Sequence, residues 1–203
     1  MNFENTKNNL EKRGFRVTIF KTAEEAAGYL EEQIKQTTVG IGGSVTVTEM
    51  GLFDRLNQNN EVWWHSHPDQ LAEYGEPELR RRAMSTEVYI CSVNGLSETG
   101  QIINIDGAGN RIASTAFGHD RLYLIVGKNK IEETFEKAMW RARNIASPKN
   151  AQRLGVKTPC AAKGDKCYDC NSPQRICRGF LTMERPMFGQ EAEVILIDEN
   201  LGY

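Results

Sequence analysis

The stretch TVGIGGSVTVTE, residues 38–49, decides the fold class of this chain. Thr38–Ile41 has the composition of a short buried strand, and Gly42-Gly43-Ser44 then allows the backbone to turn. Thr46-Val47-Thr48-Glu49 has the S/T-x-x-E spacing of a capping box, which predicts that a helix begins there. A strand, a glycine-containing turn and a capped helix in this order form the repeating unit of α/β proteins.

Strands and helices alternate along the rest of the chain in the same way. Thr22-Ala23-Glu24-Glu25 is a second capping box, and Ser97–Gly100 turns one expected strand into the next, which predicts a hairpin. We therefore expect βαβ units and a covered, mainly parallel sheet that the hairpin makes mixed. The expected strands are Phe15–Phe20, Thr38–Ile41, Glu61–Trp64, Glu87–Val93, Gln101–Ile105, Leu122–Val126 and Val194–Ile197, and the expected helices include residues 2–13, 22–34, 77–84 and 131–146.

Length and composition predict a single domain over residues 1–203, with a cysteine-rich segment at about residues 155–180. The chain has 203 residues, of which 39% are hydrophobic and 26% charged, enough to bury a sizeable core. Its formal net charge of −2 argues against a nucleic-acid-binding protein. No apolar stretch is long enough to cross a bilayer, and the first residues (MNFEN) lack a signal-peptide core, so we expect a cytoplasmic protein without membrane contact.

Four of the five cysteines lie close together in the chain. Cys160, Cys167, Cys170 and Cys177 have the spacing C-x6-C-x2-C-x6-C, symmetric about a central CxxC. Four thiolates in so short a segment can surround one soft metal centre. The alternatives are two disulfides or buried structural thiols, and disulfides are uncommon in the cytoplasm. Cys91, in the middle of an expected strand, is interpreted as a small core residue.

The spacing admits either of two metal centres. Zinc needs a tetrahedral set of thiolates, and an iron–sulfur cluster needs the same ligands on a wider cage. Basic residues surround the cysteines, since residues 148–185 contain eight Lys or Arg against three acids. This positive charge would offset the negative charge of either complex.

Two glycine-containing loops are candidates for an anion site. Gly42, Gly43 and Ser44 precede a helix N-terminus, where free N–H groups can bind a phosphate or carboxylate. They match neither a Walker loop nor GxGxxG, and two glycines before a helix also occur for steric reasons alone. The second loop, Asp106–Arg111, could equally be a simple turn.

The segment Trp63–Pro68 contains the tetrapeptide His65-Ser66-His67-Pro68 and resembles the metal-binding stretch of JAMM-type metalloproteases. That family also has a Ser and an Asp at fixed positions downstream, where this chain has Glu76 and Leu79. The third metal ligand is therefore missing. We expect the two histidines to cap the strand or to line a cleft.

Six segments, taken in order, resemble the LUD domain family, the lactate-utilisation proteins. They are Val39–Thr46, Asn104–Arg111, Val126–Ile131, Ser147–Ala151, the Thr158–Cys177 region and Asp198–Tyr203. The resemblance implies a fold like that of the NagB/RpiA/CoA-transferase group, a three-layer α/β/α sandwich. It also implies a role in lactate-type organic-acid metabolism alongside iron–sulfur partner proteins. Because the cysteines lie on this chain itself, it favours an iron–sulfur (4Fe–4S) cluster over zinc.

The main hypothesis is a LUD-family protein with an iron–sulfur or zinc centre, a small anionic substrate and iron–sulfur redox partner proteins. Its general acid or base would be Glu49 or Glu98, the latter by analogy with the loop glutamate of CoA-transferases. The alternatives are a sugar-phosphate isomerase or CoA-transferase-like enzyme with a structural metal, and a non-enzymatic metal or redox sensor. The residues expected to bind the anion are Gly42, Gly43, Ser44, Asp106, Asn110, Arg111, Lys128 and Lys130.

Overall fold

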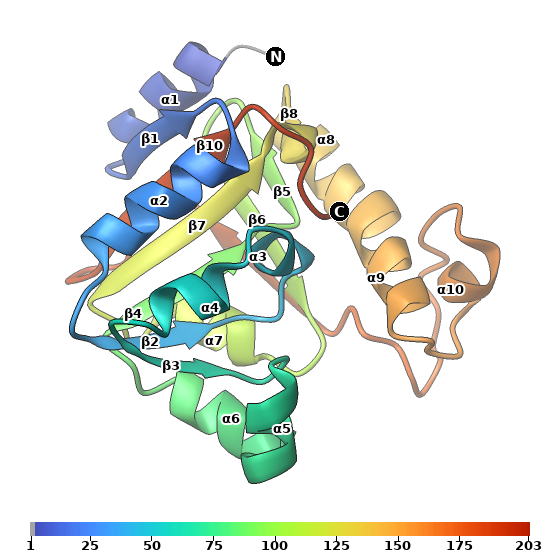
Figure 1. Cartoon of the computed structure of the whole chain (residues 1–203). Helices are drawn as coiled ribbons and strands as arrows, with labels where there is room; N and C mark the ends of the chain where they lie inside the picture. Colours follow the sequence, from blue (N-terminus) through green and yellow to red (C-terminus); the bar gives the residue numbers. More distant parts are fainter. Residues whose placement is uncertain (1–2) are drawn as a thin grey trace.

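A parallel sheet of six strands forms the centre of the computed structural model, which describes residues 3–203 (Figure 1). Each pair of neighbouring strands runs parallel. The central strands are almost continuously apolar, as expected where both faces of a sheet are covered. In spatial order the strands are β1 (Arg16–Phe20), β10 (Glu191–Ile197), β7 (Arg121–Gly127), β4 (Val88–Ser92), β2 (Thr38–Ile41) and β3 (Glu61–Trp64).

A smaller sheet of four strands packs on one face of the first. The predicted hairpin forms as β5 (Gly95–Ser97) and β6 (Ile102–Asp106), but it belongs to this second sheet and does not extend the main one. Its outer neighbours are β8 (Ile131–Glu132), parallel to β5, and β9 (Gly179–Met183), antiparallel to β6. The two sheets share a hydrophobic core, so the smaller sheet covers a face of the main sheet that a helix would cover in most α/β proteins.

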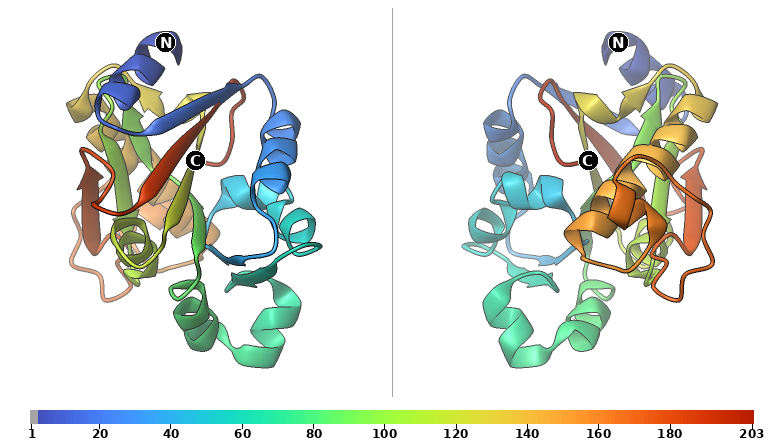
Figure 2. Two further views of the ribbon diagram at one scale, coloured as in Figure 1. Left: turned by 90° about the vertical axis from the view of Figure 1, so that its left-hand side faces the viewer. Right: turned by 90° about the vertical axis from the view of Figure 1, so that its right-hand side faces the viewer.

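Helices cover the outer faces of both sheets, as the two side views show (Figure 2). On one side, α2 (Ala23–Gln33), α3 (Val45–Glu49) and α4 (Leu52–Leu56) pack on the main sheet. On the other, α8 (Phe135–Arg141) and the π-helical segment η2 (Ala142–Ala146) pack on the second sheet and lead into α9 (Ser147–Arg153). The predicted class, an α/β sandwich around a mainly parallel sheet, is confirmed.

Helix α6 (Glu76–Ala83) approaches β2 closely because Gly40 has no side chain. A Cβ atom on Gly40 would lie 2.2 Å from the carbonyl oxygen of Ala83. The other helices described are α1 (Phe3–Lys12), α5 (Pro68–Tyr74), α7 (Asn110–Ala116) and α10 (Pro159–Lys163), with a short 3-10 turn η1 (Lys128–Lys130). The predicted first helix included Asn2, which lies outside the described residues. Nowhere in residues 3–203 is a helix both long enough and apolar enough to cross a bilayer.

The capping prediction at Thr22 is confirmed, and the one at Thr46 is wrong. Thr22 Oγ1 accepts a hydrogen bond from the N–H of Glu25, whose carboxylate accepts one from Thr22 in return. After β2 the N-cap is Ser44, whose Oγ accepts a hydrogen bond from the Val47 N–H at 3.2 Å. Thr46 therefore lies inside α3, which is only five residues long.

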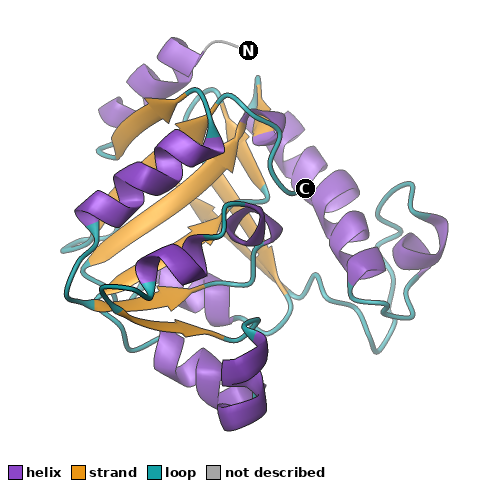
Figure 3. Cartoon of the chain, viewed as in Figure 1, coloured by secondary structure: helices purple, strands orange, loops and turns teal. Residues whose placement is uncertain are grey.

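The helix predicted over residues 131–146 is divided into several elements (Figure 3). Its first residues form β8, because Ile131 pairs with Leu96 of the second sheet. The α-helix begins at Phe135 behind the N-cap Thr134, and it widens to a π-helix after Arg141. Ser147 closes this wide turn by donating its hydroxyl to the carbonyl of Ala142 at 2.9 Å.

Candidate functional site

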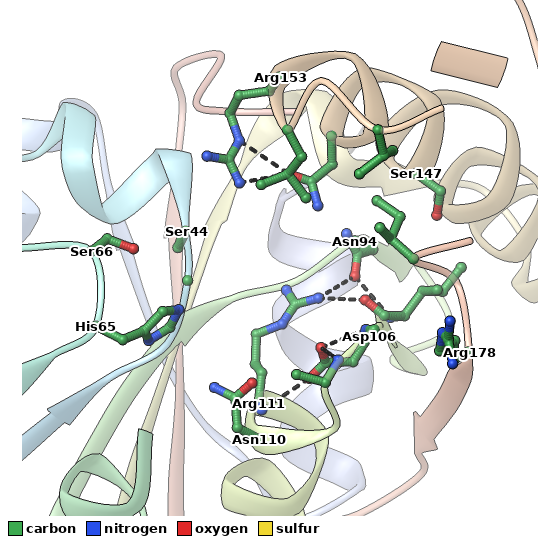
Figure 4. Close-up of a pocket in the computed structure, with 18 of the residues that line it drawn as sticks. Ser44, His65, Ser66, Asn94, Asp106, Asn110, Arg111, Ser147, Arg153 and Arg178 are labelled. Atoms are coloured by element: carbon green, nitrogen blue, oxygen red, sulfur yellow. Dashed lines mark hydrogen bonds between the residues drawn. The ribbon is translucent and has the colours of Figure 1, made fainter. Parts of the chain in front are cut away.

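A large cleft lies at the carboxyl edge of the main sheet (Figure 4). Gly43 and Ser44 follow β2, His65 and Ser66 follow β3, and Asn94 follows β4. These residues meet because the carboxyl ends of parallel strands lie at one edge of the sheet, where α/β proteins bind ligands. In Figure 4 Ser44, His65 and Ser66 lie across the cleft from Asp106 at the end of β6 and Arg111 at the start of α7, and Asn94 lies beside Arg111.

The loop that follows β6 is held rigid by the carboxylate of Asp106. Asp106 Oδ1 accepts a hydrogen bond from the Gly107 N–H at 2.7 Å, and Oδ2 accepts one from the Arg111 N–H at 2.9 Å. Burial opposes ionisation of this carboxyl, but the Arg111 guanidinium and the backbone donors outweigh burial and lower its pKa below the usual range. Asp106 is therefore an ionised anchor whose acceptor sites are occupied by its own loop.

Arg111 is fixed at the floor of the cleft. Its Nη2 donates to Asn94 Oδ1 at 2.8 Å and to the carbonyl of Ile105 at 2.6 Å, and its Nη1 donates to the carbonyl of Ser92 at 3.3 Å. All three acceptors are neutral. The guanidinium is thus oriented while its charge stays uncompensated by a direct ion pair.

Three further arginines line the cleft from the C-terminal part of the chain, and one of them, Arg175, is paired with Asp169. Arg153, at the end of α9, donates to Asn150 Oδ1 at 2.8 and 3.0 Å. Arg178 donates to the backbone carbonyls of Arg175 and Pro173. Among residues 3–203, no carboxylate side chain forms an ion pair with Arg111, Arg153 or Arg178. The cleft therefore attracts anions, and a bidentate carboxylate or phosphate matches the geometry of guanidinium donors.

His65 lines this cleft, and His67 does not. Burial, together with the charge of Arg80, lowers the pKa of His65, so its imidazole is neutral near pH 7. His65 Nδ1 is buried and has no hydrogen-bond partner in the described residues. His67 instead stacks on Phe53, with ring centroids 3.9 Å apart, at the start of α5. Only His65 is placed to contact a ligand.

The two lysines expected at the anion site have different environments. Lys130 is 3% exposed and lines a small recess of the cleft, shared with Ser44 and Arg111. Lys128 is half-buried, and its Nζ lies 3.0 Å from the carboxylate of Asp198. Lys128 lines neither the cleft nor the recess.

Neither glutamate proposed as an acid or base lines the cleft. Glu49 accepts a hydrogen bond from the backbone N–H of Gly202 at 2.7 Å, so it positions the last residues of the chain. Glu98 lies in the turn between β5 and β6, where its backbone carbonyl accepts a hydrogen bond from Asn9 Nδ2 of α1. Neither carboxylate is therefore among the residues that face a ligand in the cleft.

The adjacent glycines Gly42 and Gly43 differ in what a side chain at each position would contact. A Cβ on Gly42 would meet the Tyr89 hydroxyl at 2.8 Å, so this glycine is required for packing. A Cβ on Gly43 would point toward His65 Nε2, at 3.1 Å, on the wall of the cleft. Asn110, which was also expected at the site, lines the cleft as the first residue of α7.

The four clustered cysteines face one small pocket beside the cleft. All are half-buried free thiols, whereas Cys91 is fully buried in β4. Asp169, between Cys167 and Cys170, has a φ of 43°, a left-handed conformation that turns the CxxC loop. The described residues contain no set of three or more Cys, His, Asp or Glu close enough to hold a single metal ion.

The chemistry of this pocket suits a metal–thiolate centre. Arg143 and Arg175 line it, and Arg175 donates to the backbone carbonyls of Cys170 and Cys177 at 2.9 and 3.0 Å. The neighbouring Cys177 side chain raises the pKa of Arg175, which places a guanidinium beside that cysteine. The N–H of Asp169 also points to the sulfur of Cys167 at 3.4 Å. These donors would stabilise thiolate ligands, so the residues fit such a group.

The cysteine pocket and the cleft share a wall. Ser147, Arg175 and Ile176 line both. The backbone of Arg178 is tied to the Asp106 carbonyl at 2.9 Å, so the end of the cysteine segment is fastened to the floor of the cleft. A group bound by the cysteines would therefore lie one residue layer from a ligand in the cleft.

Sequence reasoning did not assign Asn94, Arg153 or Arg178 to the anion site. The excess of positive charge in residues 148–185 was the available signal for the two arginines, but it was attributed to the cysteines alone. Asn94 gave no signal, because its role depends on the hydrogen bond that it accepts from Arg111.

Comparisons with known proteins agree with this architecture. The sequence model of a family described as "LUD domain" matches residues 3–197. A crystal structure of a DUF162 family protein from Deinococcus radiodurans superposes with a TM-score of 0.56 at 12% identity, over 96% of this chain and 95% of that chain. At this identity the likeness concerns the fold alone. No curated protein has a significant match to the chain.

Proposed function

The chain belongs to the LUD domain family, and on that premise we propose that it binds a small carboxylate or phosphate in the arginine-lined cleft, beside an iron–sulfur or zinc centre held by its cysteines. Its role would lie in organic-acid metabolism of the lactate type, with iron–sulfur redox proteins as partners. The observation that carries the proposal is the set of three guanidinium groups, Arg111, Arg153 and Arg178, which face one cleft without a carboxylate partner in the described residues.

An anionic ligand would neutralise the positive charge of the arginines in this cleft. The ionised Asp106 carboxylate offsets part of the positive charge through space, and hydrogen bonds from the guanidinium groups to a charged ligand would contribute about 1.5–3 kcal/mol each. Arg111 is already oriented by neutral acceptors, so little side-chain entropy is lost when a carboxylate binds to it. Phosphate and carboxylate share this recognition chemistry, and the size of the ligand decides between them.

Cys160, Cys167, Cys170 and Cys177 are the residues that would hold the metal centre. An iron–sulfur cluster bound there would accept or supply single electrons, whereas zinc would serve structure alone. A lone zinc ion needs its sulfurs about 2.3 Å from one point. The wider cage of a cluster suits four cysteines around a pocket better. Ser147, Arg175 and Ile176 would then separate the ligand from the centre.

His65 is the group in the cleft suited to moving a proton. Its imidazole is neutral near pH 7, and its ring edge lies beside Gly43, where the ligand would pass. A neutral imidazole can accept a proton from a ligand hydroxyl, which a protonated one cannot. His65 therefore replaces Glu49 and Glu98 as the candidate acid–base residue.

Two measurements on the purified, anaerobically prepared protein test the proposal. Elemental analysis with a visible spectrum identifies the centre: iron with sulfide and a brown colour supports a cluster, and stoichiometric zinc in a colourless protein supports the structural alternative. Calorimetric titration with lactate, acetate and a sugar phosphate then tests the cleft, with Arg153→Met as the variant and Lys128→Met as the matched control. Absence of binding by every anion would overturn the cleft assignment. A metal centre without anion binding would favour the sensor alternative.

A further inference from the structure

Lys130 is a buried amine that the proposed anion site does not require. It ends the turn η1 after β7, and its Nζ lies 2.8 Å from Thr46 Oγ1 and 2.7 Å from Ser92 Oγ. Each hydroxyl donates its own hydrogen to a backbone carbonyl, Thr46 to Leu201 and Ser92 to Ile125. Both oxygens therefore accept from Lys130, and the amine is held in one position.

The surroundings of this amine favour its uncharged form. Burial lowers the pKa of Lys130 to about 7, and the guanidinium groups of Arg141 and Arg111 act in the same direction, against weaker opposing effects of Glu49 and Cys91. No carboxylate among the described residues forms an ion pair with it. A large fraction of Lys130 consequently carries a free lone pair near neutral pH. Desolvation and a neighbouring cation are the two means by which proteins activate a lysine as a nucleophile.

The amine also has a route to the ligand. The recess that Lys130 lines is bounded by residues that line the main cleft as well, so the two spaces adjoin. Arg111 and Arg153 lie at the junction, between the amine and the open cleft. The residues common to both spaces are Gly43, Ser44, Val45, Asn94, Arg111, Asn150 and Arg153.

We propose that Lys130 is a nucleophile that forms an imine with a 2-oxo acid whose carboxylate is held by Arg111 and Arg153. The Nζ lone pair attacks the carbonyl carbon, the resulting carbinolamine loses its oxygen as water, and a carbon–nitrogen double bond replaces the carbonyl bond. No electron acceptor or donor is needed, because one amine and one carbonyl give one imine and one water. The inference rests on the proposed function in one respect, that the cleft binds a carboxylate.

A structural role for Lys130 is the competing explanation. Its two hydrogen bonds join α3 to the end of β4, and a lysine buried for this purpose alone would be inert toward carbonyl compounds. Reactivity therefore separates the two explanations, whereas stability does not. The neighbouring Lys128 supplies the control, because it is only half-buried, paired with Asp198 and outside the recess.

Reductive trapping tests the proposal. The wild-type protein is incubated near pH 7.5 with pyruvate or glyoxylate and cyanoborohydride, which reduces imines to stable secondary amines, and the product is digested and mapped by mass spectrometry. We expect one adduct per chain, located on Lys130, retained in Lys128→Met and absent in Lys130→Met. Because mapping the wild-type protein identifies the modified residue, the result does not depend on the folding of Lys130→Met.

Calorimetric titration of the same protein with pyruvate and lactate, without reductant, tests the carboxylate-binding cleft separately from the imine on Lys130. Binding of either acid with no adduct on Lys130, or with labelling spread over exposed lysines, overturns the imine and leaves the carboxylate cleft intact. Absence of both binding and adduct overturns the cleft assignment as well. A mapped Lys130 adduct that excess lactate suppresses supports both.

Discussion

Replacing one of the four clustered cysteines should release their segment while the main sheet stays folded. Cys170→Ser removes one ligand and keeps a small polar side chain in the loop. Cys91→Ala provides the reciprocal control, because Cys91 is fully buried in β4 and its truncation should weaken the main core without touching the cysteine pocket.

The magnitude follows from how little else orders this segment. No residue from Cys160 to Cys177 is buried, and its regular structure is confined to α10, a helix of five residues. Hydrophobic burial therefore contributes little, and what remains are exposed hydrogen bonds of about 1 kcal/mol each. A four-thiolate metal centre contributes on the order of 10 kcal/mol of local folding free energy. Loss of one ligand should lower the free energy of local opening by about 3 kcal/mol or more, which is about 100-fold in exchange protection.

Hydrogen exchange read by mass spectrometry measures this effect on the metal-loaded protein. Peptides from residues 158–178 should exchange at least about 100-fold faster in Cys170→Ser, while peptides from β7 and β10 change by less than about threefold. Cys91→Ala should give the opposite pattern. Unchanged protection of residues 158–178 in Cys170→Ser would refute the claim that a shared centre orders this segment, and an equal loss in β7 would show that the segment and the sheet unfold together.

Three further outcomes are expected. Gly43→Val should weaken carboxylate binding at least about tenfold, because the new side chain fills the cleft beside His65. Gly42→Ala crowds the Tyr89 hydroxyl, so it should lower the free energy of unfolding by about 1–3 kcal/mol and leave the affinity of the folded protein unchanged. Equal affinities in Gly43→Val and wild type would contradict the anion site. Arg153→Met should weaken binding by about 1.5–3 kcal/mol with little change in unfolding, because Asn150 is the only partner found for its side chain in residues 3–203; calorimetry and urea titration measure the two effects. As pH rises from about 7 to 10, the free energy of unfolding of the wild type should increase relative to that of Lys130→Met, by up to about 1.4 kcal/mol per pH unit. The reason is that Lys130 keeps its proton in the unfolded chain but has lost it in the folded one. If the free energies of unfolding of the two proteins change with pH in parallel, Lys130 titrates normally.

The parts of the fold that could be predicted are those in which a local pattern has one physical cause. The strand at Thr38–Ile41 and the apolar run at Leu122–Val126 are buried on both faces, so their composition alone predicts them. Gly43 and Ser44 reach the cleft because any turn after a parallel strand lies at the carboxyl edge of the sheet. The four cysteines face one pocket because their spacing is too short for separate sites.

The rest depends on which segments the topology brings together. The strand–turn–strand sequence of the hairpin at residues 95–106 is compatible with either sheet. Its packing against α8 and the main core places it in the smaller sheet. Glu49 has suitable chemistry, but its carboxylate accepts a hydrogen bond from the Gly202 N–H and does not line the cleft. Lys128 and Lys130 differ by two positions in one turn, and the direction of that turn buries Lys130 and leaves Lys128 only half-buried. No sequence pattern distinguishes them.

The basic residues of the segment 148–185 line two different spaces in the folded chain. Arg175 lines the cysteine pocket, whereas Arg153 and Arg178 line the cleft, and Arg175 also forms part of the wall between them. Four thiolates around a metal and a carboxylate in the cleft are both anionic, and side by side they would repel each other across one layer of residues. Guanidinium groups on both sides of that layer, and one within it, reduce this repulsion. Under the proposed function, adjacent sites for two anions would require a cluster of arginines larger than either site needs alone, and this would account for the basic residues that extend well beyond the cysteines.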